Sequence, residues 1–243
     1  SVSFEGCVND GTVTGNGNDV GGFVGEIWSN TNITITISNA TNNCNVTGSD
    51  YSVGGFVGEV DRNTNMTMTI SNTINNGIVS GDWYAGGFVG HIGSKTNSDS
   101  ISFGIINSAN KGNVSAEDFA CGMICVYSEY GNNVNATVLN SINKGSVNAT
   151  TNAYGITNII TKARNVVSMG EVNASSDSFT FWESSTDVDL FFGMDGKCVN
   201  CTEITTLFVH NTNTGFYEVV GSGEHVHNPL NAEVEKQNYG MFW

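Results

Sequence analysis

One pattern recurs at a nearly fixed spacing along the first two thirds of the chain, and it restricts the fold to an array of similar units. Its clearest element is Val-Gly-Gly-Phe-Val-Gly, at residues 20–25 and 53–58, which recurs as Ala-Gly-Gly-Phe-Val-Gly at 85–90. One small residue anchors each copy, and the last interval is shortened: Gly11, Cys44, Gly77, Gly112, Gly145 and then Gly170. Such a period indicates units that bury their apolar faces only against their neighbours.

Residues alternate within each unit as they do in a half-buried β-strand. Ile33, Ile35 and Ile37 are separated by polar residues, and Met66, Met68 and Ile70 take the same places in the next copy. Two further columns recur once per copy, one of valines (Val13, Val46, Val79, Val114, Val147, Val172) and one of large apolar residues (Phe23, Phe56, Phe88, Met123, Ile156). Like residues at like positions are expected to stack about 4.8 Å apart if the copies are consecutive coils of a parallel sheet.

A column of asparagines favours stacked coils over the blades of a propeller. Asparagine stands two positions before each anchor, with serine in the last copy: Asn9, Asn42, Asn75, Asn110, Asn143 and Ser168. Asparagine suits tight bends, and stacked asparagines pass amide hydrogen bonds from coil to coil. Propeller blades run to about 40 to 50 residues, longer than this repeat. We therefore predict an all-β protein, with a parallel β-solenoid of about five to six coils over residues 1–174. A β-rich aromatic segment, residues 175–243, is expected to cap it or to join subunits.

The motif around residues 21–25, 54–58 and 86–90 resembles the GLUG-type repeats of bacterial and protist surface proteins and adhesins. The resemblance covers about two thirds of the chain. It implies a stalk or extended scaffold and supplies no catalytic residues. Cys121 and Cys125 replace glycines of the motif, and the C-terminal segment 175–243 matches nothing in the repeat.

Charge and hydropathy limit the partners. The net charge is −15, with 8 Lys and Arg against 23 Asp and Glu, which argues against binding a nucleic-acid backbone. No apolar run approaches the length of a membrane span. The chain begins on Ser1 inside a repeat without a signal peptide, so we expect a processed product or a piece of a longer protein.

Nine Asn-x-Ser/Thr sequons are candidate N-glycosylation sites. About seven would occur by chance in this composition, so their position is the better argument. Asn32, Asn65 and Asn135 alternate with inward residues, whereas Asn45, Asn113, Asn148 and Asn173 flank the valine column, and all seven are expected to face outward. The alternation of inward and outward residues along the preceding strand would place Asn39 near the core, and Asn200 lies in the C-terminal segment. Glycans would require passage through a eukaryotic secretory pathway.

The six cysteines favour disulfides in an oxidising, extracellular compartment. Cys7 and Cys44 flank one bend on adjacent coils and are predicted to lie close enough to bridge. Cys198 and Cys201 form a local pair without the context of a redox or zinc site. Cys121 and Cys125 would be too far apart on a straight strand, so they require either a bend between them or partners elsewhere.

Few residues suggest chemistry. His225 and His227 beside Glu224 could bind a metal, but exposed loop residues are the favoured interpretation. Asp187, Asp189 and Asp195 lack the spacing of a calcium loop. We therefore predict no catalytic residue, cofactor or metal. A polysaccharide-degrading β-helix enzyme is a distant third function, because only two arginines are present to bind sugar acids.

The two ends of the repeat array suggest assembly. Val2 and Phe4 occupy core positions with no capping sequence before them, and the C-terminal segment is rich in aromatic residues, ending in Tyr239, Phe242 and Trp243. The first hypothesis is a secreted, glycosylated subunit of a fibre or surface scaffold that assembles head to tail. The alternative is a monomeric adhesin or stalk that binds carbohydrate or protein, for which exposed aromatic residues would have to cluster on one column.

Overall fold

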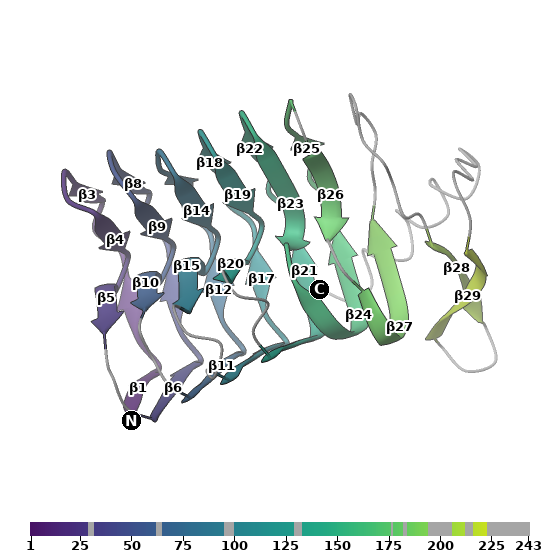
Figure 1. Cartoon of the computed structure of the whole chain (residues 1–243). Helices are drawn as coiled ribbons and strands as arrows, with labels where there is room; N and C mark the ends of the chain where they lie inside the picture. Colours follow the sequence, from purple (N-terminus) through teal and green to yellow (C-terminus); the bar gives the residue numbers. More distant parts are fainter. Residues whose placement is uncertain are drawn as a thin grey trace.

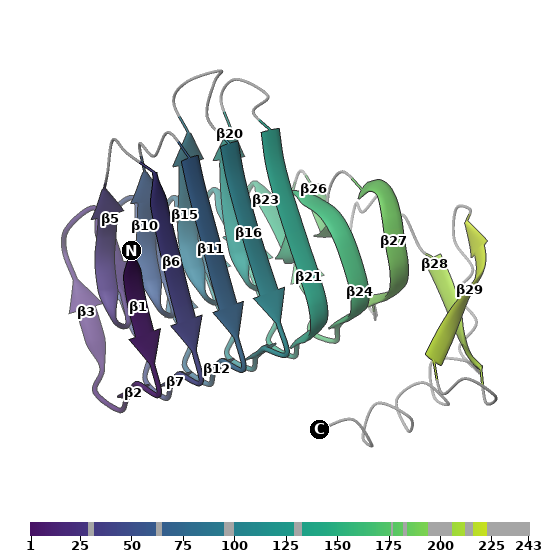
Figure 2. The same cartoon turned by 90° about the horizontal axis from the view of Figure 1, so that it is seen from below.

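The computed structural model is a parallel β-solenoid, which confirms the predicted fold class (Figure 1). It describes residues 1–28, 32–61, 65–94, 100–128, 133–175, 177–181, 184–193, 206–211 and 216–222, and these contain no helix. The coils stack in sequence order, each beside the next (Figures 1 and 2). Four full-length turns separate Gly11 from Gly145, fewer than the five to six coils expected, because the next copy, which ends at Gly170, is truncated.

Three parallel sheets run along the solenoid, and a small antiparallel hairpin follows them. The 11-stranded sheet contains β1 (Val2–Glu5), β6 (Ile33–Ser38), β11 (Asn65–Ser71), β16 (Ser100–Ile106), β21 (Asn133–Asn143), β24 (Ile160–Ser168) and β27 (Ser184–Gly193), with the short strands β2 (Val8–Asn9), β7 (Thr41–Asn42), β12 (Ile74–Asn75) and β17 (Ala109–Asn110). The six-stranded sheet contains β3 (Val13–Gly15), β8 (Val46–Gly48), β13 (Val79–Ser80), β18 (Val114–Ala116), β22 (Val147–Ala149) and β25 (Val172–Asn173).

The ten-stranded sheet bends once in every coil. Before the bend lie β4 (Asp19–Gly21), β9 (Ser52–Gly54), β14 (Tyr84–Gly86) and β19 (Phe119–Cys121), whereas β23 (Asn152–Thr157) and β26 (Asp177–Phe181) run through it. After it lie β5 (Val24–Trp28), β10 (Val57–Asp61), β15 (Val89–Ser94) and β20 (Ile124–Ser128). The hairpin pairs β28 (Thr206–Asn211) with β29 (Phe216–Ser222).

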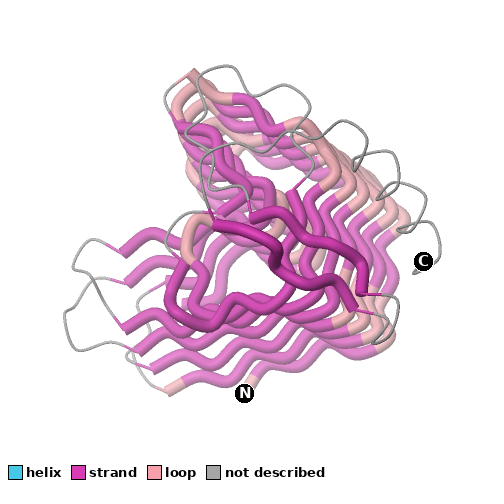
Figure 3. The backbone as a smooth tube through the Cα atoms, turned by 90° about the vertical axis from the view of Figure 1, so that its right-hand side faces the viewer, coloured by secondary structure: helices cyan, strands magenta, loops and turns pink. Residues whose placement is uncertain are grey.

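Each coil has a wide arm and a narrow arm, which the view along the stacking direction shows (Figure 3). The wide arm packs β10 against β11 and their equivalents around the Ile, Met and Phe columns. The narrow arm packs β8 against β9 and their equivalents around the valine column, which is fully buried at Val46, Val79 and Val114. The register pairs Met66 with Ile33 and Val2 with Ile35, as the alternation predicted.

The Gly-Gly-Phe-Val-Gly motif forms the bend between the two arms. A Cβ on Gly54 would overlap the carbonyl oxygen of Val57, and a Cβ on Gly55 would overlap that of Gly87 in the next coil. The backbone therefore approaches itself and the next coil too closely for any side chain. Phe56 then inserts into the wide arm, where its ring stacks on that of Phe23 with centroids 5.0 Å apart.

The predicted asparagine ladder is confirmed, and it lies at the waist where the two arms meet. Asn75 Nδ2 donates to Asn110 Oδ1 at 2.8 Å, and Asn75 Oδ1 accepts from Asn42 Nδ2 at 2.8 Å. The same amide donates a second bond to the carbonyl oxygen of Gly77, also at 2.8 Å. Asn42, Asn75, Asn110 and Asn143 are fully buried. The ladder thus satisfies the buried amides of successive coils with one another.

A second asparagine column, which was not predicted from the sequence, turns the chain out of the wide arm. Its members have positive φ angles between 48° and 52°: Asn39, Asn72, Asn107 and Asn140. Gly6 takes the same place in the first coil with φ 63°. The prediction that Asn39 lies near the core is wrong. This left-handed turn, which asparagine tolerates, rotates its side chain into solvent.

Parallel pairing continues past the predicted boundary at residue 174. β26 pairs with β23, and β27 pairs with β24 as far as Gly193. The later aromatic segment is represented by the β28–β29 hairpin, whereas Cys198, Asn200, Cys201 and the residues from 223 onward lie outside the described residues. The described part of the chain contains no helix with the length and hydropathy that crossing a membrane requires.

Candidate functional site

The outer faces of the bent sheet meet in a corner that collects most of the polar and aromatic groups of interest. Along β9 and its neighbours, Val53 and Ala85 point into the narrow arm, so Ser52 and Tyr84 point the other way. Along β10 and its neighbours, Val60 and its equivalents point into the wide arm. The side chains left on the concave side of the bend face one another, and we call this region the inner corner.

Aromatic rings of the second, third and fourth coils meet in the inner corner. The ring of Tyr84 stacks on that of His91 with centroids 4.6 Å apart and on that of Phe119 at 5.2 Å. Tyr51 lies edge-on to His91 at 5.7 Å. Tyr84 and His91 are buried, whereas Tyr127, whose ring lies 6.2 Å from His91, is 39% exposed. The rings therefore join the two walls of the corner.

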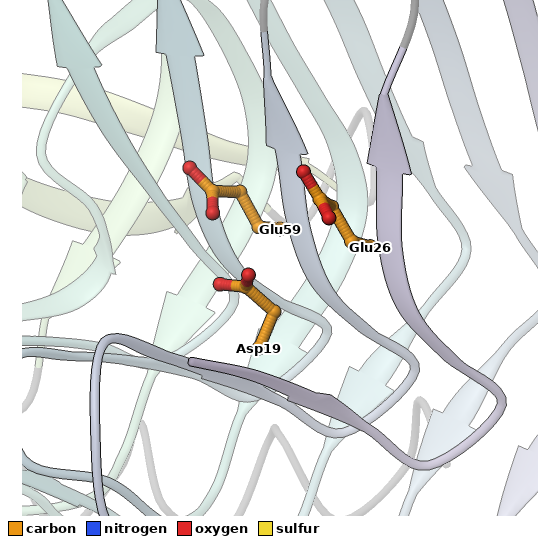
Figure 4. A group of neighbouring side chains, drawn as sticks. All are labelled: Asp19, Glu26 and Glu59. Carbon is orange, nitrogen blue, oxygen red and sulfur yellow. The ribbon is translucent and has the colours of Figure 1, made fainter. Parts of the chain in front are cut away.

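Carboxylates fill the inner corner in the first two coils (Figure 4). Oxygen atoms of Asp19, Glu26 and Glu59 all lie within 4.8 Å of one another. Glu26 and Glu59 are register partners on β5 and β10, and His91 follows them on β15. His91 Nδ1 lies 2.8 Å from Glu59 Oε1. The groups on β5, β10 and β15 stand two positions after the Phe-Val of each motif, a recurrence that the sequence could have revealed.

Burial and the crowding of the carboxylates move the pKa of Asp19 into the neutral range. Burial, together with the hydrogen bond and the charge of Glu59, raises the pKa of Asp19 from its ordinary 3.8 to about 7. A neutral Asp19 can donate to Glu59, which removes the repulsion between them. The three carboxylates are also the described residues best placed to hold a cation. The hydrogen bond between Asp19 and Glu59 already accounts for their approach, so we infer no metal from the three carboxylates.

Access limits the chemistry of this corner. Glu59, Asp61 and His91 are buried, so Asp19 and Glu26 are the carboxylates of the group that reach solvent. A raised pKa in a corner is a common property of catalytic carboxyl groups, but structural carboxyl pairs have it too. The geometry favours a structural role for the buried pair of Glu59 and His91. Asp19 and Glu26, which reach solvent, are the groups that could contact a partner.

The disulfide lies at the inner corner and joins Cys121 to Cys125, the pair that was expected to bridge only across a bend. Cys121 ends β19 and Cys125 lies in β20, and they form a disulfide with Cα atoms 5.4 Å apart. Gly122 and Met123 make the bend that this pair demanded. The bridge therefore ties together the two walls in the coil where the motif glycines are replaced.

The predicted bridge between Cys7 and Cys44 is absent, because both are free thiols. The two side chains belong to different arms. Cys7 packs against the core of the wide arm, whereas Cys44 is buried in the core of the narrow arm. Cys44 Sγ lies 3.0 Å from Asn9 Nδ2, so the asparagine ladder stands between the two arms at this point. Burial raises the pKa of the Cys44 thiol.

Eight of the nine sequon asparagines lie in the described residues, and none of them is buried. Six are exposed, Asn32, Asn39, Asn45, Asn65, Asn113 and Asn135, and two are partly exposed, Asn148 and Asn173. Some stack on neighbouring coils. Asn65 Nδ2 donates to Asn32 Oδ1 at 2.9 Å, and Asn173 Nδ2 donates to Asn148 Oδ1 at 2.9 Å.

The first coil forms one end of the described solenoid. Each of β1 to β5 is hydrogen-bonded to one neighbouring strand in the described structure. Val2 and Phe4 lie in β1 and are partly exposed, whereas their register partners Ile35 and Ile37 are buried. The other assembly candidates, Tyr239, Phe242 and Trp243, lie outside the described residues.

Comparisons of the chain with models of protein families, with curated proteins and with solved structures give no match. The resemblance to GLUG-type repeats therefore stays a prediction.

Proposed function

We propose that the protein is a secreted structural subunit that assembles head to tail into an extracellular fibre or surface scaffold and carries N-linked glycans. The observation that carries this proposal is the strand edge that the first coil presents at one end of the described solenoid. Apolar columns continue into this coil, yet Val13, Phe23 and Val24 are only partly buried there, whereas the same columns are fully buried one coil later. A further coil in the same register would bury these residues and pair the free backbone groups.

The direction of the backbone amides identifies where the next subunit would bind. In the second and third coils, Thr41 and Ile74 donate their N–H groups to the preceding coil, at 2.9 Å to Cys7 O and 3.0 Å to Ala40 O. Val8 is the register partner of Thr41. Its N–H group is therefore directed away from the second coil, toward the position of an added strand.

Val8→Pro tests the edge, because proline removes this donor and places its ring where the added strand would lie. Electron micrographs of the purified protein are expected to show regular filaments for the parent chain and for Val8→Ala, but separate rods for Val8→Pro. Deletion of residues 239–243 is expected to abolish filaments if the C-terminal segment forms the other half of the joint. Discrete rods for the parent chain, or filaments unaffected by Val8→Pro, would reject the proposal.

Glycosylation is supported by the exposure of the sequons, and it is tested by measuring the mass of the secreted protein. Protein secreted from eukaryotic cells is expected to lose mass on treatment with an N-glycosidase. Asn65→Gln is expected to lower the mass by that of one glycan if this site is used. An intact mass equal to the sequence mass before treatment would exclude the glycans.

The second function is an adhesin-like module that binds a ligand on the solenoid face. It is supported by Tyr51 and Trp83, aromatic residues at one position of consecutive coils, since their successors Ser52 and Tyr84 are register partners. Trp83 is 53% exposed, and a large exposed apolar side chain beside a second ring is typical of an interaction surface.

A further inference from the structure

The tip of the narrow arm combines exposed aromatic rings with a column of carboxylates. The turns before β9, β14 and β19 place Asp50, Asp82 and Glu117 on consecutive coils, each next to or near an aromatic residue. Trp83 N donates to Asp50 O at 3.4 Å, and Glu117 N donates to Asp82 O at 2.6 Å, so the turns stack directly. We call Asp50, Tyr51, Asp82, Trp83 and Glu117 the acidic–aromatic rim.

The rings of the rim form a platform at the mouth of the inner corner. The centroids of Tyr51 and Trp83 are 5.5 Å apart, with the ring planes 33° from parallel. Tyr51 also contacts Tyr84 and His91, so it is anchored on the buried rings of the corner. Trp83 lies outside it and exposes about half of its surface. A ligand can therefore contact this indole without displacing the core.

Carboxylates recur on successive coils of the rim, and no cationic side chain among the described residues neutralises them. The backbone positions that carry these carboxylates are one strand spacing apart, ~5 Å, and like charges at such positions repel. No ion pair joins Asp50, Asp82 or Glu117 to the described part of the chain. The strands that form the two walls of the corner in the first five coils contain neither Lys nor Arg.

We propose that the acidic–aromatic rim binds a basic segment of a partner protein, with an arginine or lysine side chain over the Trp83 ring and its neighbours between the carboxylates. The exposed indole face attracts cations, and the stacked carboxylates can form ion pairs with the basic residues that flank the bound side chain. A neutral sugar would use the rings but leave the repulsion between the carboxylates. This inference develops the ligand-binding alternative and is independent of filament assembly.

Binding of an amidated hexa-arginine peptide, measured by titration calorimetry at low salt, tests the proposal. Trp83→Leu is expected to weaken binding about two- to fivefold, since it keeps an apolar side chain but removes the ring. Trp28→Leu is the matched control, because Trp28 is similarly exposed, at 58%, on the other wall. Binding is also expected to weaken in roughly 0.5 M salt.

A charge-matched pair separates a site from general attraction to an acidic protein. Glu117→Gln and Glu5→Gln change the net charge equally, and neither side chain is buried, but Glu5 lies on β1, outside the rim. Glu117→Gln is expected to weaken peptide binding about threefold, whereas Glu5→Gln leaves it unchanged. Equal losses from both variants, absence of binding at millimolar peptide, or Trp83-dependent binding of a neutral N-acetylglucosamine hexamer in place of the peptide would overturn the proposal. Val8→Pro, which tests assembly, is expected to leave the peptide affinity unchanged.

Discussion

Replacing one buried member of the asparagine ladder measures how much the ladder contributes to stability. Asn75→Ala removes two bonds donated by Nδ2, to Gly77 O and Asn110 Oδ1, and one accepted by Oδ1 from Asn42. At about 1 kcal/mol for each buried bond, the free energy of unfolding is expected to fall by about 3 kcal/mol. For a chain of this size, that lowers Tm by about 6–12 °C.

Two variants serve as controls for this measurement. Asn76→Ala removes the exposed neighbour, whose Nδ2 donates to Asn43 Oδ1 at the surface, and is expected to cost less than about 0.5 kcal/mol. Asn9→Ala removes the partly exposed first member of the ladder and is expected to cost an intermediate amount. Urea unfolding followed by circular dichroism gives all three values. If Asn75→Ala costs no more than Asn76→Ala, the ladder is a consequence of the fold and does not stabilise it.

The bend and the inner corner give three further predictions. Gly87→Ala is expected to abolish folding or to lower Tm sharply, because its Cβ would overlap the carbonyl oxygen of Gly122. Gly104→Ala is the control, since a Cβ there meets open space, and it is expected to be neutral or slightly stabilising. Equal Tm values for the two variants would contradict this prediction. Because the folded-state pKa of Asp19 is raised to about 7, the protein is expected to lose stability as pH rises from about 4 to 7, and Asp19→Asn to reduce that loss in urea unfolding at pH 5 and 8. The full pKa shift corresponds to about 4 kcal/mol, which solvent screening of this half-buried group reduces to about 1–2 kcal/mol. Replacing both disulfide cysteines, Cys121 and Cys125, with alanine is expected to lower the free energy of unfolding by about 2 kcal/mol, and an unchanged urea midpoint would refute this.

Periodicity allowed most of the fold to be predicted from sequence. A column such as Val46, Val79 and Val114 can be identified by counting, and a parallel sheet is the arrangement that brings its members together in every coil. The same count identified the asparagine ladder. The column at Asn39, Asn72, Asn107 and Asn140 has the same period. It was missed because the inward–outward alternation of the strand was assumed to continue past its end, where the chain instead makes a left-handed turn.

The inner corner could not be predicted, because it depends on the direction of the bend. Glu59, His91 and Cys125 lie on one wall, and Ser52, Tyr84 and Cys121 on the other. Their distances along the chain give no indication that the two walls face each other. The disulfide shows this clearly, because a straight strand would hold its cysteines too far apart, whereas the bend brings their Cα atoms to 5.4 Å.

The sequence by itself determined that the chain stacks in coils, which residues face inward and which asparagines form the ladder. These properties depend on periodicity, because each of these residues packs on or bonds to the equivalent residue of the next coil. Only the tertiary structure decided that each coil has two arms, that Cys7 and Cys44 belong to different cores, and that Asp19 is hydrogen-bonded to Glu59. These properties depend on the angle at a glycine bend, which sets the contacts between residues at different positions of the repeat.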